Sequence, residues 1–319
     1  MDIKHFSKQL IQWGIRNTAQ DLYILPENTH YNLLFRTPHS KIKYKQLSKE
    51  YGEKLIFHFK FIGQMDVGEK RRAQVGAATY QVDGEDRRLR LSTVGDFKQR
   101  ESMVIRFLHH FGDSSEHYLL PWQLTSIRAA VRSDGLHLFC GPVGSGKTTL
   151  MYKLAKEKQG NRQVICIEDP VEIEEEAFLQ LQTNYKIDLT YDTLIKACLR
   201  HRPDILIIGE IRDSLTAKAA IRAALTGHTV FATIHSRGIG GVWARLMELG
   251  IHPSELEECL KSTIYQKLLP AKIRGQTVSA LLMEYRFSET NQTVWNNMLR
   301  KVWSYGFIDD STFSKEQRV

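Results

Sequence analysis

The amino-terminal part of the chain opens with a helical repeat of apolar residues. Large apolar side chains recur every three or four positions from Ile3 to Trp13, and Asn17 follows as a residue that commonly ends a helix. Apolar residues at this spacing fall on one stripe of a helix. We therefore expect an amphipathic helix that packs against a core through this stripe.

Strand patterns follow this helix. The runs DLYILP (21–26) and YNLLFR (31–36) are rich in strand-forming residues, and the turn-forming ENTH separates them. They predict two strands joined by a short turn. A second helix, of mixed polarity, is expected over about 45–62.

The clearest alternation in this part of the chain lies in RRLRLSTV (87–94). It places Arg88, Arg90 and Ser92 on one face of a strand and Leu89, Leu91 and Thr93 on the other. The run SMVIRFL (102–108) predicts one more strand. We expect a small α+β domain over residues 1–112, with a linker within HHFGDSSEH (109–117).

Beyond about Leu119 the pattern changes to short, wholly apolar runs that alternate with helical stretches. Strands are expected at 136–140, 163–168, 204–210 and 229–235, and helices at 121–133, 148–157, 192–199 and 214–227. Apolar strands that are each followed by a helix are typical of a parallel sheet covered on both faces. We predict an α/β domain over residues 113–319, with a helical tail at 291–307.

Composition narrows the class of protein. The 319 residues are 42% hydrophobic and 25% charged, which is typical of a folded globular chain. No apolar run is long enough to span a membrane and the first 30 residues do not form a secretory signal, so we expect a cytoplasmic protein. The four cysteines form no CxxC pair, so no zinc module is expected.

The net charge of +8 indicates anionic partners but does not choose among them. No stretch combines basic and aromatic residues as a base-stacking track would. We therefore expect no direct binding of nucleic acid.

The segment GPVGSGKTT matches the phosphate-loop pattern G-x-x-x-x-G-K-[ST], and it lies between an expected strand and an expected helix. Its glycines allow backbone N–H groups to surround phosphates, and the helix N-terminus adds positive potential. Lys147 would reach the β- and γ-phosphates of ATP, and Thr148 would bind Mg²⁺. The loop comprises Gly141, Pro142, Val143, Gly144, Ser145, Gly146, Lys147, Thr148 and Thr149.

Carboxylates end the next two expected strands. CIEDPVE places Glu168 and Asp169 at one strand end, and LIIGEIRD places Glu210 at the other. Because the carboxyl ends of parallel strands meet at one edge, these side chains should face the phosphate loop. A carboxylate there can orient and deprotonate the attacking water, and we assign this role to Glu210.

The position before Glu210 is unusual for a nucleotide hydrolase. Many enzymes of this plan carry a magnesium-holding Asp there, whereas this chain has Gly209. Glu168 and Asp169 on the neighbouring strand are the candidates to serve the metal through bound water. The sequence does not choose between them.

Histidines and arginines complete the candidate set. His228 and His235 bracket the strand TVFATI, so either can act as a γ-phosphate sensor, although their spacing puts them on opposite faces of an ideal strand. Phosphoryl transfer also needs positive charge near the developing negative charge. Arg90 and Arg106 can supply that charge, or can be ordinary exposed strand cations.

Together these motifs resemble those of the secretion ATPase superfamily, which powers type II secretion and type IV pilus assembly. The phosphate loop, the acidic box IEDPVE, the second nucleotide motif GEIRD and the histidine box TGHTVFATIH occur together, as in that superfamily. The resemblance implies a RecA-like P-loop NTPase core with a parallel sheet covered by helices, preceded by a small PAS-like α+β domain. It also maps the trans-acting arginines of the superfamily onto Arg90 and Arg106.

Within the superfamily, the short chain and the stretches QDLYILP and DVGEKRR most resemble the ComGA-type competence ATPases of Gram-positive bacteria. This implies an Mg²⁺-dependent ATPase motor that drives assembly of a DNA-uptake pseudopilus. It further implies a homo-hexamer that docks on a polytopic membrane platform protein at the inner face of the cell membrane. A retraction-type pilus motor and a hexameric nucleic-acid-stimulated ATPase are the alternatives.

Overall fold

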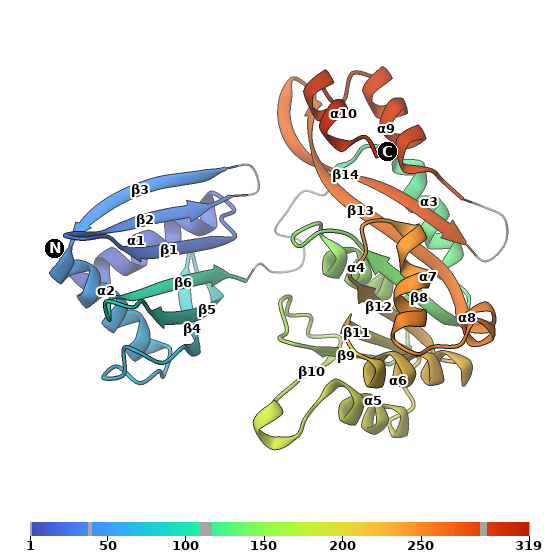
Figure 1. Cartoon of the computed structure of the whole chain (residues 1–319), viewed down its shortest axis with the longest axis horizontal. Helices are drawn as coiled ribbons and strands as arrows, with labels where there is room; N and C mark the ends of the chain where they lie inside the picture. The colour runs from blue at the N-terminus through green and yellow to red at the C-terminus, as the bar shows by residue number, and fades with distance from the viewer. Residues whose placement is uncertain (1, 38–39, 109–116, 288–291, 319) are drawn as a thin grey trace. The chain divides into compact units, whose positions relative to one another are not determined.

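A computed structural model of the chain describes residues 2–37, 40–108, 117–287 and 292–318. The chain divides into two compact units, Met1–His109 and His110–Val319 (Figure 1). The domain boundary expected after residue 112 lies outside the described residues. So does the linker expected within 109–117, except for its last residue. Among the described residues, no helix is long and apolar enough to cross a membrane.

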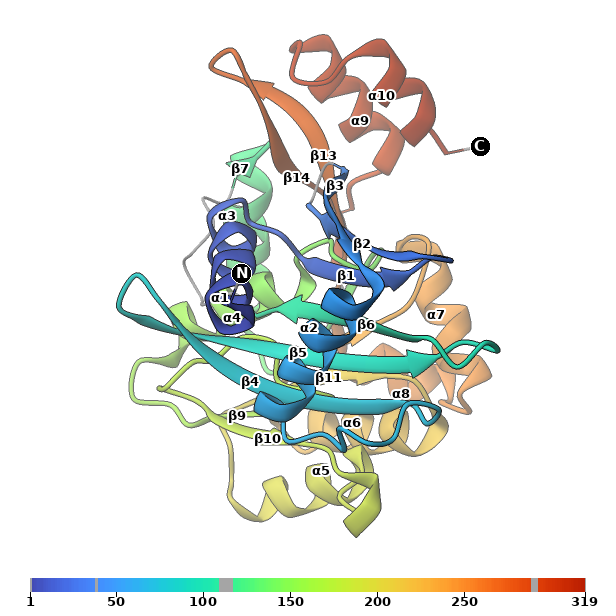
Figure 2. The same ribbon diagram turned by 90° about the vertical axis from the view of Figure 1, so that its left-hand side faces the viewer.

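Within these ranges, the smaller unit contains one antiparallel six-stranded sheet in the order β3-β2-β1-β6-β5-β4 (Figure 2). Helices α1 (Ile3–Arg16) and α2 (Lys49–Ile62) contact each other and pack on the sheet. The strands are β1 (Asp21–Pro26), β2 (His30–Arg36), β3 (Lys41–Ser48), β4 (Gln74–Val82), β5 (Glu85–Gly95) and β6 (Glu101–Phe107).

The sequence predicts the inner part of this sheet better than its edges. The first helix, the strands at 21–26 and 31–36, and the alternation in 87–94 are confirmed, and Leu89 and Leu91 are buried. The helix expected from residue 45 begins only at Lys49, because the residues before it form β3. Both β3 and β4 were missed, and both are edge strands, whose exposed side chains weaken the apolar alternation.

The larger unit is built on an eight-stranded sheet, counted over the described residues, in the order β10-β9-β11-β12-β8-β13-β14-β7. Its strands are β7 (His117–Tyr118), β8 (Gly135–Cys140), β9 (Val164–Glu168), β10 (Leu179–Gln182), β11 (Ile205–Ile211), β12 (Thr229–Ile234), β13 (Leu260–Ile273) and β14 (Gln276–Phe287). Neighbouring strands are parallel except for β13 and β14, which form an antiparallel hairpin.

Helices cover both faces of this sheet, as predicted (Figure 1). On one face, α4 (Lys147–Gln159) packs against strand residues such as Ile205 and Ile207 of β11, and α3 (Pro121–Ala130) packs against β14. The other face, which includes Leu206 and Ile208, is covered by α5 (Tyr191–Arg200), α6 (Ser214–Leu225), α7 (Ile239–Glu248), α8 (Pro253–Cys259) and α9 (Trp295–Ser304). A short 3₁₀ helix, Tyr185–Ile187, precedes α5.

The β13–β14 hairpin and the last helix were not predicted. A two-residue turn joins the strands, and both of its residues, Arg274 and Gly275, have positive φ, as a type I′ turn requires. The tail expected to be helical at 291–307 does contain α9, which packs on β14. A further helix, α10 (Asp310–Glu316), packs on α9.

Candidate active site

The phosphate loop lies between β8 and α4, as the sequence predicts. Gly141, Gly144 and Gly146 have positive φ, a conformation that lets successive N–H groups face one anion. The Nζ of Lys147 donates to the carbonyl oxygens of Gly141 (3.0 Å) and Pro142 (2.9 Å). Burial lowers the pKa of Lys147. The loop therefore holds a desolvated ammonium group close to its own backbone.

Strand β13 contacts this loop through Gln266. The side chain of Gln266 is fully buried, and its Nε2 donates to the carbonyl oxygen of Ser145 (2.7 Å). Within the described residues, the buried Ser145 Oγ has no hydrogen-bond partner. An unpaired buried hydroxyl in this loop fits a ligand rich in oxygen atoms, such as a phosphate.

Strands β9 and β11 bring the predicted carboxylates to the same edge. Ile167 pairs with Ile208 in the parallel register, so Glu168 and Gly209 follow side by side. A Cβ at position 209 would lie 2.9 Å from the Tyr191 hydroxyl oxygen and 3.2 Å from Cα of Glu168. Any side chain at this position, that of Asp included, would therefore require Tyr191 or the backbone of Glu168 to shift.

Glu168 is a buried acid. Its side chain is only 3% exposed, and this burial raises its pKa to about 7, while the hydrogen bond donated by the Tyr152 hydroxyl acts in the opposite direction. Gln180 Nε2 in turn donates to the Tyr152 hydroxyl oxygen (2.7 Å). Asp169, the next residue, is exposed. The two members of the acidic pair thus occupy different environments.

Glu210 is held between a histidine and an arginine. Nε2 of His235 lies 2.7 Å from Oε1 of Glu210, and Nε of Arg212 donates to Oε2. The Glu210 side chain is 12% exposed. Since β12 pairs with β11 up to Ile234, His235 extends from the carboxyl end of the neighbouring strand. The structure therefore brings His235 to the predicted water-activating carboxylate.

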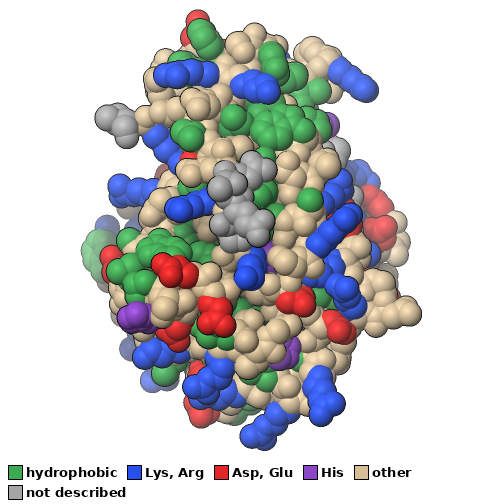
Figure 3. All heavy atoms as spheres, turned by 90° about the vertical axis from the view of Figure 1, so that its right-hand side faces the viewer, with side chains coloured by type: hydrophobic (Ala, Val, Ile, Leu, Met, Phe, Trp, Pro, Cys, Tyr) green, Lys and Arg blue, Asp and Glu red, His purple; other side chains and the backbone are tan. Residues whose placement is uncertain are grey.

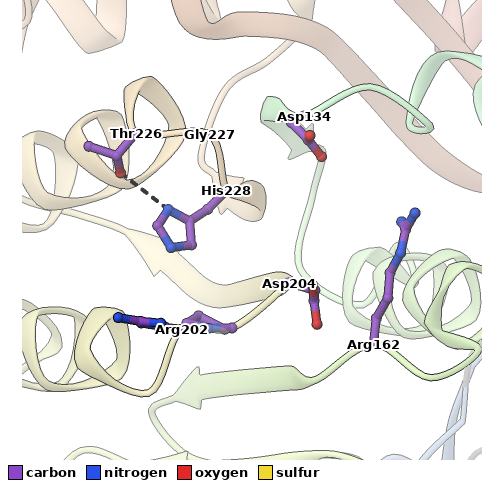
Figure 4. A pocket seen from close by; sticks show the side chains of 8 residues that line it. Asp134, Arg162, Arg202, Asp204, Thr226, Gly227 and His228 are labelled. Carbon is purple, nitrogen blue, oxygen red and sulfur yellow. Dashed lines mark hydrogen bonds between the residues drawn. The ribbon is translucent and has the colours of Figure 1, made fainter.

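His228 lies at the opposite edge of the sheet. Thr229, the residue after it, pairs with Gly135 at the amino end of β8, whereas the phosphate loop follows the carboxyl end of that strand. His228 Nδ1 lies 3.2 Å from Thr226 Oγ1, in a shallow pocket (Figure 4). The structure does not bring His228 together with the phosphate loop of its own chain, because the length of β12 separates them. The pocket is lined by Asp134, Arg162, Arg202, Pro203, Asp204, Thr226, Gly227 and His228.

The two predicted arginines lie in the smaller unit and are neighbours there. Arg90 on β5 pairs directly with Arg106 on β6. They lie on the face of the sheet opposite to the buried Leu89 and Leu91. Nε of Arg106 donates to Asp21 Oδ1 (3.0 Å). The structure therefore gathers two cations on one outer face of this sheet.

The cysteines form no pair with one another, and the Cys166 thiol interacts with the Tyr152 hydroxyl. All four are buried and reduced. Within the ranges described, no group of three or more His, Cys, Asp and Glu side chains is placed to hold a metal ion.

Comparison with known proteins identifies the family. A family model described as "Type II/IV secretion system protein" matches residues 2–298. The chain belongs to this family. The chain is 44% identical to Competence protein ComGA of Streptococcus pneumoniae over 308 residues, which cover 96% of each chain. It is 39% identical to Competence protein ComGA of Bacillus subtilis over 84% of this chain and 76% of that one.

Solved structures confirm the fold of this type II/IV secretion system protein. The ATPase DotB of Legionella pneumophila superimposes with a TM-score of 0.77 over 97% of this chain and 94% of that one, at 19% identity. This likeness confirms the expected α/β architecture with a RecA-like core. Family membership and the phosphate loop make the chain an ATP-hydrolysing enzyme.

Three residues at this edge escaped prediction. Tyr152 and Gln266 have no local sequence signal, because each acts through a partner that is distant in sequence or on another element. Arg212, which donates to Glu210, was not assigned a role from the sequence. A signal for Gln266 could have come only from recognising β13 as a neighbour of β8.

Proposed function

We propose that this chain is an Mg²⁺-dependent ATPase motor that powers assembly of a competence pseudopilus for DNA uptake. It would act in the cytoplasm, at the inner face of the cell membrane, against a polytopic membrane platform protein. One observation carries the proposal: the phosphate loop, Glu168 and Glu210 meet at one sheet edge in a chain closely related to competence proteins.

The residues at this edge fit Mg²⁺ as well as nucleotide. Mg²⁺ prefers hard oxygen ligands and keeps several waters, and this edge offers the Thr148 hydroxyl and carboxylates. Thr148 would hold the ion directly, and Glu168 and Asp169 would hold it through water. When bound, Mg²⁺ supplies neutralising charge to the β- and γ-phosphates.

The protein residues divide the remaining work. Lys147 binds the β- and γ-phosphates, and the N–H groups of the loop surround them. A carboxylate oxygen of Glu210 accepts a proton from the attacking water while the water oxygen bonds to the γ-phosphorus. The bond from that phosphorus to the bridging oxygen breaks, and ADP and inorganic phosphate leave. His235, which lies beside Glu210, would change its contacts when the γ-phosphate is lost.

Arg90 and Arg106 would complete this site in a neighbouring subunit of a homo-hexamer. Their adjacency on one outer face supports the idea, since two cations there can approach the same phosphate group. A mixture of Arg90→Ala and Lys147→Ala chains tests it. Some mixed interfaces would combine an intact loop with intact arginines, so the mixture should hydrolyse ATP faster than either variant alone. A mixture that hydrolyses ATP no faster than the two variants do separately would contradict action in trans.

Native mass in the presence of Mg²⁺ and a non-hydrolysable ATP analogue tests the ring itself. A hexamer is expected. A monomer at high protein concentration would contradict it.

The cellular role is tested by replacing the chromosomal copy with Lys147→Ala. Surface pseudopili and DNA uptake should both disappear, whereas the exposed-surface variant Arg300→Ala should retain them. Pseudopili that persist in greater number would instead indicate a retraction motor.

On the face shown in Figure 3, Lys and Arg side chains are interspersed with Asp and Glu, as on an ordinary solvated surface.

A further inference from the structure

Arg318, in the segment after α10, is held against the core of the larger unit. Its guanidinium carbon lies 4.2 Å from the ring centre of Tyr265 and 4.6 Å from that of Trp295. Its Nη1 donates to Oε2 of Glu284 (2.7 Å). Cation–π contacts and a charge-assisted hydrogen bond therefore fix the guanidinium in one place.

The backbone around Arg318 is fixed as well. The Arg318 N–H donates to Asn296 Oδ1 (2.9 Å), and Asn296 Nδ2 donates to the Arg318 carbonyl oxygen (2.6 Å). Trp295 Nε1 donates to the carbonyl oxygen of Glu316 (2.8 Å), whose carboxylate accepts from Lys267. The segment is thus tied to α9 and to β13, so the position of the arginine is well specified.

The guanidinium also packs on the loop that follows β12. A Cβ at Gly238 would lie 2.7 Å from Arg318 Nη1 and 3.4 Å from Cζ, so only glycine allows this approach. Ser236 Oγ donates to the Gly238 carbonyl oxygen (2.7 Å), which makes this short loop compact. The loop begins at His235, whose Nε2 lies 2.7 Å from Glu210. Arg318 therefore contacts the backbone that carries His235.

On its other side, Arg318 contacts the strand that supports the phosphate loop. Tyr265, which faces the guanidinium, precedes Gln266, which bonds to the Ser145 carbonyl oxygen. Nη2 of Arg318 is buried and, within the described residues, has no partner. An arginine that served stability alone would be expected to have its buried donors paired.

We propose that Arg318 is a positioning residue for ATP hydrolysis. It holds the 236–238 loop against β13 and thereby places His235 on Glu210. Arg318 touches neither the nucleotide nor the reacting atoms. This inference rests on the proposed role of Glu210 in the reaction.

The first test is steady-state ATP hydrolysis by full-length Arg318→Ala. We expect kcat to fall about tenfold, because displacements of about 1 Å far from the chemistry can cost on the order of 100-fold. KM and the affinity for Mg²⁺·ADP, measured by calorimetry, should stay within about twofold, because the contacts of the phosphate loop remain. Arg318→Lys should recover part of the rate, since it keeps the charge over the rings but loses the planar fork.

A second variant separates positioning from general stability. Gly238→Ala would push the guanidinium away and should lower kcat as Arg318→Ala does. In the Arg318→Ala background, the same change should cost almost nothing further, because the contact is already lost. Arg300→Ala, an exposed arginine on α9, is the matched control and should hydrolyse ATP at the normal rate.

The outcomes are distinguishable. A lower melting temperature with unchanged kcat in Arg318→Ala would overturn the proposal and leave a structural contact only. Additive losses in the double variant would also overturn it. Full hydrolysis by Glu210→Gln would refute the proposed role of Glu210 itself, whatever the Arg318 variants do.

Discussion

The two edges of the eight-stranded sheet carry similar residues in different environments. At the carboxyl edge, Glu168 and Glu210 are 3% and 12% exposed and have specific partners. At the amino edge, a pocket of about 280 Å³ is lined by charged residues that remain exposed, among them Asp134, Arg162 and Arg202. Both edges have charges and a histidine, so residue type does not distinguish them. Burial of the carboxylates does.

The two histidines that flank β12 differ in which end of the strand they follow. His235 lies against Glu210, whereas His228 contacts Thr226 and the carbonyl oxygen of Ala223 at the other end of the strand. In a parallel α/β sheet, ligands bind outside the carboxyl ends of the strands. Only His235 is at that end.

The largest difference between the edges is expected for Lys147→Ala. Removing the ammonium group that binds the phosphates should lower kcat/KM for ATP by at least about 100-fold, a loss typical of a missing transition-state charge. Arg162→Ala, at the amino edge, should leave kcat/KM within about twofold. The measurement is steady-state hydrolysis with Mg²⁺. Comparable losses in both variants would remove the distinction between the edges.

Gly209→Asp tests the close packing at the carboxyl edge. The new side chain would meet Tyr191 and the backbone of Glu168, and it would bury a second carboxylate. We expect a loss of about 1–3 kcal/mol in unfolding free energy, as for other overpacked sites, and reduced hydrolysis. Gly240→Ala is the control, because a Cβ there meets no atom within 4 Å. An unaffected melting temperature for Gly209→Asp would contradict the packing argument.

The pH dependence of stability tests the burial of Glu168. Burial raises its pKa from 4.5 to about 7, so the folded protein holds this proton more tightly than the unfolded chain. Its contribution to stability is complete below about pH 4.5 and is lost as the pH rises through 7.

Glu168→Gln has no such proton to lose. In urea unfolding without nucleotide or Mg²⁺, the wild type should therefore lose about 1–3 kcal/mol relative to this variant between pH 4.5 and pH 8. Parallel pH profiles would show that Glu168 is not desolvated.

The smallest effect is expected for the histidines. His235→Ala should lower kcat about tenfold, as for loss of one positioned group, while His228→Ala should leave the affinity for Mg²⁺·ADP unchanged. Calorimetry and steady-state rates would measure both. Weaker ADP binding by His228→Ala would place that residue at a nucleotide after all.

The sequence predicts the parts of this molecule that depend on neighbouring residues. The phosphate loop, Glu168 and Glu210 follow strands whose apolar runs are unmistakable, and parallel strands bring their ends together. Gln266 and Arg318 could not be predicted, because each acts on residues far away in sequence, across strands whose order was unknown. The missed edge strand β3 shows the same limit, since nearly all its side chains are exposed and only its pairing with β2 identifies it as a strand.

The reaction assigned to the carboxyl edge is tested most directly by Glu210→Gln. The substitution keeps the size of the side chain and removes the oxygen that accepts the proton from water. Binding of Mg²⁺·ATP should remain within about twofold of the wild type, and single-turnover hydrolysis should slow by about 100-fold or more. Hydrolysis at the wild-type rate by a folded Glu210→Gln protein would contradict the assignment.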